Sequence, residues 1–268
     1  MSLKNKSIAF IGAGNMGEAL IRGLLAVKAV APQRLTAVDV LPERRKLLEA
    51  KFGIRTMSDI PQSDILVLAV KPQQMSAVLP TLKSQFSDLK LIITIAAGVT
   101  TARIERELGG NVHVVRVMPN TPALIGAGAA ALAPGQFATE DDLATAEAIF
   151  GAVGITVRVD ETALDAVTAL SGSGPAYVFL VAEAMITAGL EVGLSADVAK
   201  KLAMQTILGA AKLMADGREE PAELRRKVTS PGGTTEAAIK VMMQRQLPET
   251  FSEAIAAATR RGRELTGA

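Results

Sequence analysis

The sequence predicts an α/β protein in two parts, a parallel sheet covered by helices on both faces followed by a part made only of helices. Three observations predict this fold. Strand-sized apolar runs alternate with helical patterns through residue 160, strand signals stop after Asp160, and the 268 residues exceed one typical domain. We therefore expect one domain over residues 1–160 and a second over residues 161–268.

The expected sheet is built from short apolar runs separated by helical segments. Its strands are expected at 8–11, 35–38, 64–70, 91–95, 112–118, 129–133 and 155–159, and helices at 42–51, 73–82, 100–108 and 139–150. Strands that alternate with helices in this way form a parallel sheet with both faces covered. The pattern leaves open whether the last strands run antiparallel or lie at the edge.

The second part is expected to be helical throughout, at residues 161–170, 175–193, 195–217, 221–227 and 235–264. The helix that begins at Pro175 is apolar around most of its circumference, with Glu183 as its early charge. Such a helix needs partners on several sides, and roughly a hundred residues of helix offer a limited core. We therefore expect a homodimer in which the helices of two chains interlock, which makes the second part a dimerisation domain.

A glycine-rich turn joins the first strand to the first helix. The strand at 8–11 runs into Ile11-Gly12-Ala13-Gly14-Asn15-Met16-Gly17, and a helical pattern follows. In this context Gly12 allows a tight turn, Gly14 lets a pyrophosphate approach the backbone, and Gly17 allows close helix packing. Asp39 follows the next strand, where an acidic residue binds ribose hydroxyls, although it could also simply end the strand. The first part is therefore predicted to be a Rossmann-like dinucleotide-binding domain.

Composition favours a cytoplasmic enzyme. Lys and Arg number 29 against 27 Asp and Glu, without a long block of one sign, so no nucleic-acid partner is expected. The sequence has no cysteine and no acidic cluster with metal-ligand spacing, so we expect neither disulfides nor a metal. It shows no basic and apolar leader, and apolar runs such as 65–70 are too short to span a membrane. We therefore expect a cytoplasmic protein that does not contact a membrane.

A loop rich in hydroxyls and glycines precedes the last helical segment. Ser230-Pro231-Gly232-Gly233-Thr234-Thr235 leads into a helix expected to begin near Glu236 and to be capped by Thr234 or Thr235. Pro231 fixes one φ angle, and the two glycines permit conformations that bring N–H groups together. Such a helix N-terminus suits a carboxylate or a phosphate, and an ordinary loop-to-helix turn is the alternative.

Further motifs occur in the order found in one enzyme family. Besides the glycine turn and the loop at 230–235, they are Ala69-Val70-Lys71-Pro72-Gln73, Ile95-Ala96-Ala97-Gly98-Val99, Arg116-Val117-Met118-Pro119-Asn120-Thr121-Pro122 and Leu170-Ser171-Gly172-Ser173-Gly174-Pro175-Ala176-Tyr177. In these motifs, over essentially its whole length, the chain resembles the pyrroline-5-carboxylate reductases. The resemblance implies reduction of the cyclic imine 1-pyrroline-5-carboxylate to L-proline, the last step of proline biosynthesis, with NADPH or NADH. It also implies a homodimer, which in this family can assemble into a larger ring of dimers.

The resemblance also assigns residues to the two ligands. The residues expected to bind the cofactor are Ile11, Gly12, Ala13, Gly14, Asn15, Met16, Gly17, Asp39, Val70, Lys71, Pro72, Ala96, Ala97 and Asn120. The residues expected to bind the substrate carboxylate are Ser230, Gly232, Gly233, Thr234 and Thr235, with the Thr235 hydroxyl near the imine nitrogen as the catalytic group. Alternatives stay open: a strand exit with a solvated lysine at 71, a tight turn at 96–98 and a rigid interdomain bend at 118–122.

The chain lacks an evident acid for carbonyl reduction. Its one histidine, His113, alternates with apolar positions of a strand, and its one tyrosine, Tyr177, lies in the first turn of an apolar helix, so both are interpreted as structural. Reduction of a carbonyl needs a proton donor as hydride arrives, whereas a cyclic imine takes its proton from solvent first. The resulting iminium accepts hydride without building negative charge, so the protein mainly has to hold the reactants in line.

Two other functions and the choice of cofactor stay open. A β-hydroxyacid dehydrogenase would carry a lysine in the helix after its Gly-rich turn, but the first two turns after Pro175 have none. A non-catalytic nucleotide sensor could share the fold. NADPH is the family expectation, whereas Asp39 would repel a 2′-phosphate and favours NADH. Arg44 and Arg45 follow closely and could offset that repulsion.

Overall fold

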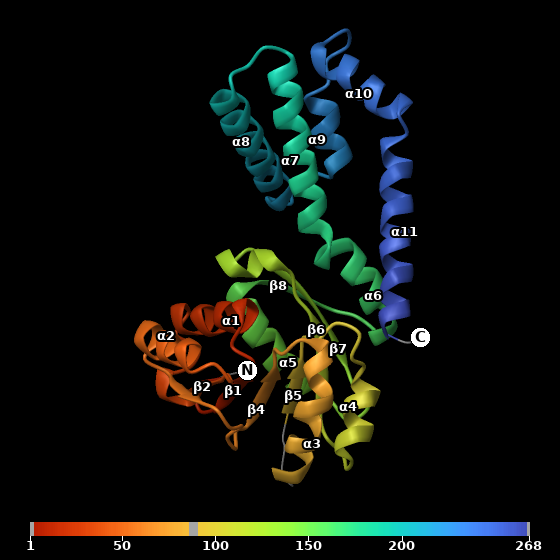
Figure 1. The fold of residues 1–268 in the computed structure, drawn as a ribbon. Coiled ribbons are helices and arrows are strands. Elements are labelled where there is room, and N and C mark those ends of the chain that lie inside the picture. Colours follow the sequence, from red (N-terminus) through yellow and green to blue (C-terminus); the bar gives the residue numbers. More distant parts are fainter. Residues whose placement is uncertain (1–2, 86–90, 267–268) are drawn as a thin grey trace. The chain divides into compact units, whose positions relative to one another are not determined.

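The computed structural model describes residues 3–85 and 91–266. The chain forms two compact units (Figure 1). One runs through Ser173 and takes in the chain from Ala257 onward, and the other is Gly174–Ala256.

The first unit is built on an eight-stranded sheet with the order β3-β2-β1-β4-β5-β6-β7-β8. The strands are β1 (Ile8–Ile11), β2 (Leu35–Val38), β3 (Arg55–Met57), β4 (Ile65–Leu68), β5 (Leu91–Thr94), β6 (Val114–Met118), β7 (Gly128–Pro134) and β8 (Gly154–Arg158). Strands β1 to β6 are parallel, β7 pairs antiparallel with β6, and β8 lies parallel to β7 at the edge. The predicted α/β fold is confirmed, and the open question about the last strands is answered.

Helices cover both faces of this sheet, because alternate strand residues point to opposite sides. In β1, Ile8 and Phe10 belong to one hydrophobic cluster, and Ala9 and Ile11 belong to another. The first cluster packs against α1 (Asn15–Ala26), α2 (Pro42–Phe52) and α5 (Glu140–Phe150), and the second against α3 (Met75–Gln85) and α4 (Thr101–Leu108). The strand alternation and the two apolar helix layers therefore explain the doubly covered sheet.

The segment after Asp160 packs on the sheet unit. It contains α6 (Leu164–Val167) and a π-helical turn (Thr168–Gly172), in place of the single helix expected at 161–170. Leu164 is fully buried in a small cluster with Met118 of β6 and two alanines of β7. The compact units therefore divide the chain after Ser173, later than the boundary predicted after residue 160.

The last helix contributes to both compact units. Its C-terminal end packs on the sheet unit: the Thr266 hydroxyl donates to Asp165 Oδ1 at 3.1 Å, and a Cβ on Gly98 would lie 2.9 Å from the Leu265 carbonyl oxygen. This helix, α11 (Leu247–Thr266), is separate from α10 (Thr234–Gln244), so the single helix expected at 235–264 is wrong. The helices separate at Gln246, whose φ of 56° is left-handed.

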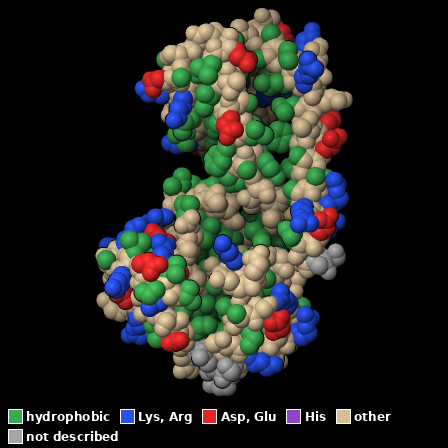
Figure 2. Space-filling model, in the orientation of Figure 1, with side chains coloured by type: hydrophobic (Ala, Val, Ile, Leu, Met, Phe, Trp, Pro, Cys, Tyr) green, Lys and Arg blue, Asp and Glu red, His purple; other side chains and the backbone are tan. Residues whose placement is uncertain are grey.

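The second unit is all helical and has almost no core of its own. It contains α7 (Gly174–Glu191), α8 (Ala196–Ala215), α9 (Pro221–Lys227), α10 and the first part of α11. Of residues 174–256, all of which are described, only Ala199 and Ala203 are buried. Large apolar side chains lie on its surface (Figure 2). Among them, Phe179 is 60 % exposed and Leu180 is 65 % exposed. This unit therefore needs a further partner to bury its apolar faces.

Candidate active site

The glycine turn after β1 has the geometry that a bound pyrophosphate requires. Gly12 has a φ of +88°, and a Cβ at this position would lie 2.8 Å from Val70 Cγ1 and 2.9 Å from the Ala69 carbonyl oxygen. A Cβ on Gly17 would lie 2.8 Å from the Gly12 carbonyl oxygen, whereas one on Gly14 would meet no heavy atom within 4 Å. The first and third glycines are therefore required by packing, and the second leaves open space in front of α1.

The N-terminus of α1 is free to accept an anion from that space. Gly14 is its N-cap residue and supplies no side-chain cap, and α1 begins at Asn15, followed by the half-buried Met16. Ile11 and Ala13 are buried and hold the turn against the core. Backbone N–H groups at a helix N-terminus, without a side-chain cap, fit a phosphate group.

Two other predicted cofactor segments leave the sheet beside the glycine turn. Val70, Lys71 and Pro72 follow β4, and the closeness of Val70 to Gly12 places this segment against the turn. Ala96 and Ala97 follow the adjacent strand β5. Ala96 is buried in the hydrophobic cluster that packs against α3 and α4, and Ala97 is exposed. These residues therefore lie at the carboxyl ends of neighbouring parallel strands, the edge at which open α/β sheets bind ligands.

The side chain of Asn120 is held by the protein itself. Its Nδ2 donates to the Ser171 carbonyl oxygen at 3.1 Å, and its Oδ1 accepts from the Ala129 N–H at 2.9 Å. The amide therefore links the end of β6 to the start of β7 and to the π-helical turn. This geometry fits the rigid-bend interpretation of the Pro119–Pro122 loop, and contact between Asn120 and the cofactor stays a prediction.

Asp39 lies at the end of β2 beside the glycine turn. Its Oδ2 accepts from the Ala13 N–H at 3.2 Å, and its Oδ1 accepts from the Leu41 N–H at 3.0 Å. The neighbouring arginines are already engaged: Arg44 Nε donates to the Ala13 carbonyl oxygen at 2.7 Å, and Arg45 donates to the Asp39 carbonyl oxygen at 2.7 Å. The acid therefore borders the place where the adenosine ribose of a dinucleotide would lie.

The predicted substrate residues form one loop on the second unit. Gly232 has a φ of +72°, and the Gly233 N–H donates to the Ser230 carbonyl oxygen at 3.0 Å, which closes a tight turn. Ser230 and Thr234 are exposed, and Thr235 is half-buried. The turn therefore presents hydroxyls and the start of α10 on the surface of this unit.

The predicted cap of this helix is wrong. The N-cap residue is Gly233, without a side-chain bond, and α10 begins at Thr234, so both threonines lie inside its first turn. The side-chain bond at this helix start comes from Glu236, whose Oε2 accepts from the Gly232 N–H at 2.8 Å. One of the N–H groups expected to hold the substrate carboxylate is thus bonded to a carboxylate of the chain.

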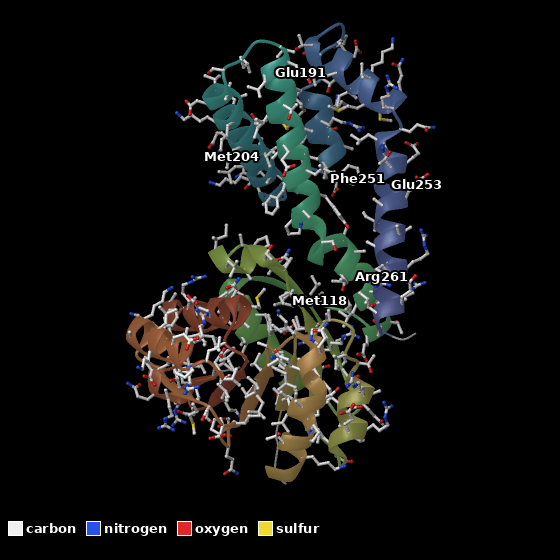
Figure 3. All side chains as sticks on the ribbon, viewed as in Figure 1. Met118, Glu191, Met204, Phe251, Glu253 and Arg261 are labelled. Carbon is white, nitrogen blue, oxygen red and sulfur yellow. The ribbon has the colours of Figure 1, made fainter. Side chains whose placement is uncertain are left out.

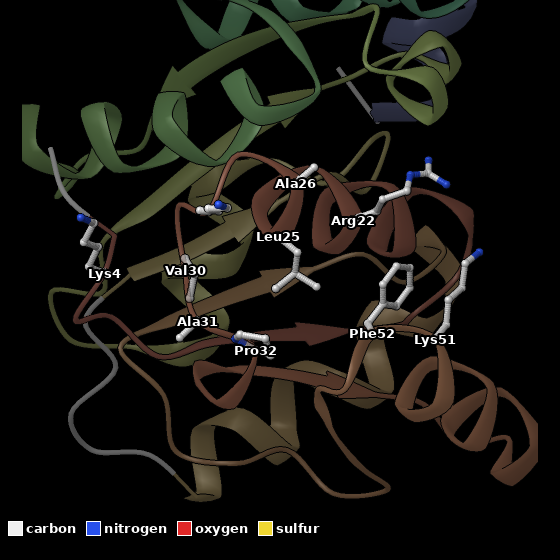
Figure 4. A pocket seen from close by; sticks show the side chains of 10 residues that line it. Lys4, Arg22, Leu25, Ala26, Val30, Ala31, Pro32, Lys51 and Phe52 are labelled. Carbon is white, nitrogen blue, oxygen red and sulfur yellow. The ribbon is translucent and has the colours of Figure 1, made fainter.

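A separate groove lies away from the glycine turn. It encloses about 790 Å³ and is lined by the C-terminal ends of α1 and α2 and the segment between α1 and β2 (Figure 4). Leu25 and Phe52 form part of its apolar wall, and Lys51 Nζ lies 5.4 Å from the centre of the Phe52 ring. None of the residues expected to bind cofactor or substrate lines this groove.

Comparison with known proteins decides the family. Residues 161–265 match the family model for pyrroline-5-carboxylate reductase dimerisation, and residues 7–98 match the model for NADP oxidoreductase, coenzyme F420-dependent. A pyrroline-5-carboxylate reductase of Methanosarcina acetivorans is 45 % identical, over 98 % of this chain and 99 % of that protein. The chain belongs to the pyrroline-5-carboxylate reductase family.

Solved structures of the pyrroline-5-carboxylate reductase family have the same fold. The Coxiella burnetii reductase is 40 % identical, with a TM-score of 0.94 over 98 % of this chain and 99 % of that one. The Plasmodium falciparum reductase, solved with NADP bound, is 30 % identical, with a TM-score of 0.85 over 98 % of this chain and 99 % of that one. The cofactor of the family is NAD(P)H, which agrees with the geometry of the glycine turn.

The single histidine has a structural role, and two glutamates near the predicted ligand residues were not expected from the sequence. His113 Nδ1 lies 2.7 Å from Asp142 Oδ2, at the capping box of α5. The described residues contain no group of three or more His, Cys, Asp or Glu that could hold a metal ion. Sequence reasoning missed Glu18, which pairs with Arg44 of α2, and Glu236, which bonds to Gly232 of the predicted substrate loop. The sequence signal for both glutamates is their position near the start of a helix. Glu18 follows Gly17 directly, and Glu236 is the third residue of α10.

Proposed function

We propose that the chain reduces 1-pyrroline-5-carboxylate to L-proline with hydride from NADPH or NADH, the last step of proline biosynthesis. The observation that carries this proposal is the match to reductases of this name, at 45 % to 37 % identity over nearly the whole chain. The β-hydroxyacid dehydrogenase alternative is disfavoured, because α7 contains no lysine. The sensor alternative predicts nucleotide binding without turnover.

The cofactor, when bound, supplies the hydride, and the chain positions it. The N-terminus of α1 would hold the pyrophosphate, since the space at Gly14 is open. Asp39 would accept hydrogen bonds from the adenosine ribose. Val70 and Ala97, at the ends of β4 and β5, would border the nicotinamide half, and Lys71 and Pro72 would direct the chain out of the sheet beside it.

The loop from Ser230 to Thr235 would bind the substrate. Its carboxylate would accept hydrogen bonds from the Ser230 hydroxyl and from N–H groups at the start of α10, where the helix dipole favours negative charge. The bond from the Gly232 N–H to Glu236 would have to open if that N–H is to bind the substrate. Thr235, half-buried in the first turn, would place its hydroxyl beside the imine nitrogen.

No strong acid is required of the chain in this reaction. The imine proton comes from solvent before hydride arrives, relayed through the Thr235 hydroxyl, which also orients the ring, and no alkoxide has to be stabilised. Most of the rate enhancement would then come from holding the reacting carbon in line with the hydride donor.

We propose that the chain works as a homodimer through its helical unit. The family model for dimerisation covers the exposed helices, which carry apolar residues such as Met204 on α8 and Phe251 on α11 (Figure 3). By length and composition alone, Glu161–Glu191 could cross a membrane, but it falls within the dimerisation match, so a second chain and not lipid would cover it. A ring of such dimers in the cytoplasm is the expected assembly. Light scattering without detergent should give a dimer or a multiple of it, and a monomer at all concentrations would refute this.

The activity is tested by following nicotinamide absorbance with purified protein and 1-pyrroline-5-carboxylate. We expect turnover with the parent protein, and a roughly 10- to 100-fold lower kcat in Thr235→Val, as for loss of one hydrogen bond to a charged group. Nucleotide binding should be unchanged. Thr250→Val is the matched control, because that hydroxyl bonds the carbonyl oxygen of Gln246, the residue just before its own helix. Nucleotide binding without turnover in the parent would favour the sensor, and parent-like kcat in Thr235→Val would reject its role.

A further inference from the structure

The loop between β2 and α2 determines how an adenosine ribose can be recognised. We propose that Asp39, together with the ion-pair cluster Glu18–Arg44–Lys51, makes this chain prefer NADH over NADPH. The proposal deepens the proposed function, since it names the cofactor that the same nucleotide site selects.

Asp39 is fixed in a position that a 2′-phosphate would have to approach. The N–H groups of Ala13 and Leu41 each donate to one of its carboxylate oxygens, at 3.2 Å and 3.0 Å. These bonds come from the glycine turn on one side and from the β2–α2 loop on the other, so the carboxylate is held between them. A ribose with free hydroxyls can donate to such a carboxylate. A 2′-phosphate would instead bring a second anion against it, and close like charges cost several kcal/mol.

Arg44 is one of the two residues expected to offset that repulsion, but the Nε and Nη2 of its guanidinium are already bonded. Its Nε donates to the Ala13 carbonyl oxygen at 2.7 Å, and its Nη2 lies 2.6 Å from Glu18 Oε2. Only 21 % of the Arg44 side chain and 15 % of the Glu18 side chain are exposed. The guanidinium is therefore packed on the glycine turn, with its charge met by Glu18.

Glu18 also binds a second cation of α2. Lys51 Nζ lies 2.7 Å from Glu18 Oε1, so one carboxylate holds both cations. The hydrogen bond from Lys51 lowers the pKa of Glu18, and Arg44 lowers it further, although burial opposes them. Arg45 is engaged differently, since its Nη1 donates to the carbonyl oxygens of Asp39 and Val40 at 2.7 Å and 3.2 Å. Glu18 thus keeps Arg44 from binding a 2′-phosphate, and Asp39 repels that group.

The experiment measures binding of ADP-ribose and of 2′-phospho-ADP-ribose by calorimetry, with neither nicotinamide nor substrate present. The variants are Asp39→Ser, Glu18→Gln and the double variant, and Glu43→Gln is the control. Glu43 is an exposed acid in the first turn of α2, so its substitution removes the same charge close to the site. Parent-like binding of ADP-ribose, or a parent-like melting curve, identifies variants that remain folded.

We expect the parent to bind ADP-ribose at least about tenfold more tightly than the 2′-phosphorylated ligand, because a close like charge costs more than 1.4 kcal/mol. Asp39→Ser should move this ratio toward the 2′-phosphorylated ligand by roughly tenfold. The double variant should bind that ligand several-fold more tightly than Asp39→Ser, because Arg44 is released. Glu43→Gln should keep the parent ratio.

Two results would overturn the proposal. Equal or tighter parent binding of 2′-phospho-ADP-ribose would show that Asp39 does not select against the phosphate. A double variant that behaves like Asp39→Ser would remove the role of Glu18. Failure of the proposed function is a different result, because a sensor would show these binding ratios without reducing 1-pyrroline-5-carboxylate.

Discussion

Replacing Glu161 with alanine tests the buried ion pair that attaches the segment after the last strand to the sheet. Arg116 Nη1 of β6 lies 3.1 Å from Glu161 Oε1, with the side chains 4 % and 24 % exposed. The same carboxylate accepts from the Thr101 N–H at 2.9 Å and from the Thr101 hydroxyl at 2.6 Å, at the start of α4. The substitution therefore removes three contacts and leaves the buried guanidinium without this partner.

The expected cost is large because Arg116 cannot reach water. Removing one member of a buried ion pair lowers the free energy of unfolding by about 3–5 kcal/mol. Because Glu161 is partly exposed, we expect a loss near the lower limit, about 3 kcal/mol. At about 2–4 °C per kcal/mol for a domain of this size, Tm should fall by roughly 6–12 °C. Thermal unfolding followed by circular dichroism, at one protein concentration and without nucleotide, measures this change.

A matched variant and a double-mutant cycle separate the buried pair from a general effect of losing a glutamate. Glu140→Ala removes a surface acid that is 82 % exposed and lies 2.6 Å from Arg158, so its Tm should stay near that of the parent. In an Arg116→Met background, Glu161→Ala should cost clearly less, since no buried charge is left unpaired. A Tm of Glu161→Ala equal to that of Glu140→Ala, or an equal cost in both backgrounds, would refute the reasoning.

Three further predictions concern the ligand loops. Gly12→Ala should abolish nucleotide binding and lower Tm, since its Cβ would meet Val70 and Ala69 within 3 Å at a left-handed φ; parent-like calorimetric binding would contradict this. The pKa of Glu18 is lowered by Lys51 from 4.5, so its contribution to stability is present above that pH and is lost as the pH falls through the lowered value. Acid titration of unfolding should therefore show a smaller loss of stability in Glu18→Gln than in the parent, and equal losses would refute the pair. Glu236→Gln should lower the KM for 1-pyrroline-5-carboxylate several-fold with little change in kcat, because loss of one anion weakens competition for the Gly232 N–H. An unchanged KM would show that this bond persists when the substrate is bound.

Most of the sheet unit could be predicted because each element carries its own signal. The apolar runs at Ile65–Leu68 and Leu91–Thr94 form buried central strands, and the glycine turn lies between β1 and α1 as its spacing indicates. Strand β3 was missed because Arg55-Thr56-Met57 is short and not buried, and its position is set by pairing with β2. Such edge strands are defined by tertiary contacts that a local pattern does not contain.

The parts of the helical region that could not be predicted depend on single residues and on long-range packing. Gln246 separates two helices by adopting a left-handed conformation that is uncommon without glycine, and the local sign of the break is Pro248, the second residue of α11. The segment from Glu161 to Gly172 has a helical pattern, but its placement follows from Leu164 in a sheet cluster and from the bond between Glu161 and Arg116. The hydrogen bonds of Asn120 are equally non-local, since they join residues 9 and 51 positions away.

Both candidate ligand loops contain a carboxylate of the chain, and the difference between these carboxylates indicates different roles. Asp39 is held by two backbone N–H groups from separate segments, so moving it would break both bonds. Glu236 is an exposed side chain with one bond to the Gly232 N–H, and its net contribution lies at the low end of the about 1.5–3 kcal/mol of a bond to a charged group, because water competes for the exposed carboxylate. An arriving substrate carboxylate can displace Glu236 at this small cost, whereas no arriving phosphate can displace Asp39 without disrupting the glycine turn. We therefore expect Asp39 to set which nucleotide binds and Glu236 to set how tightly the substrate binds.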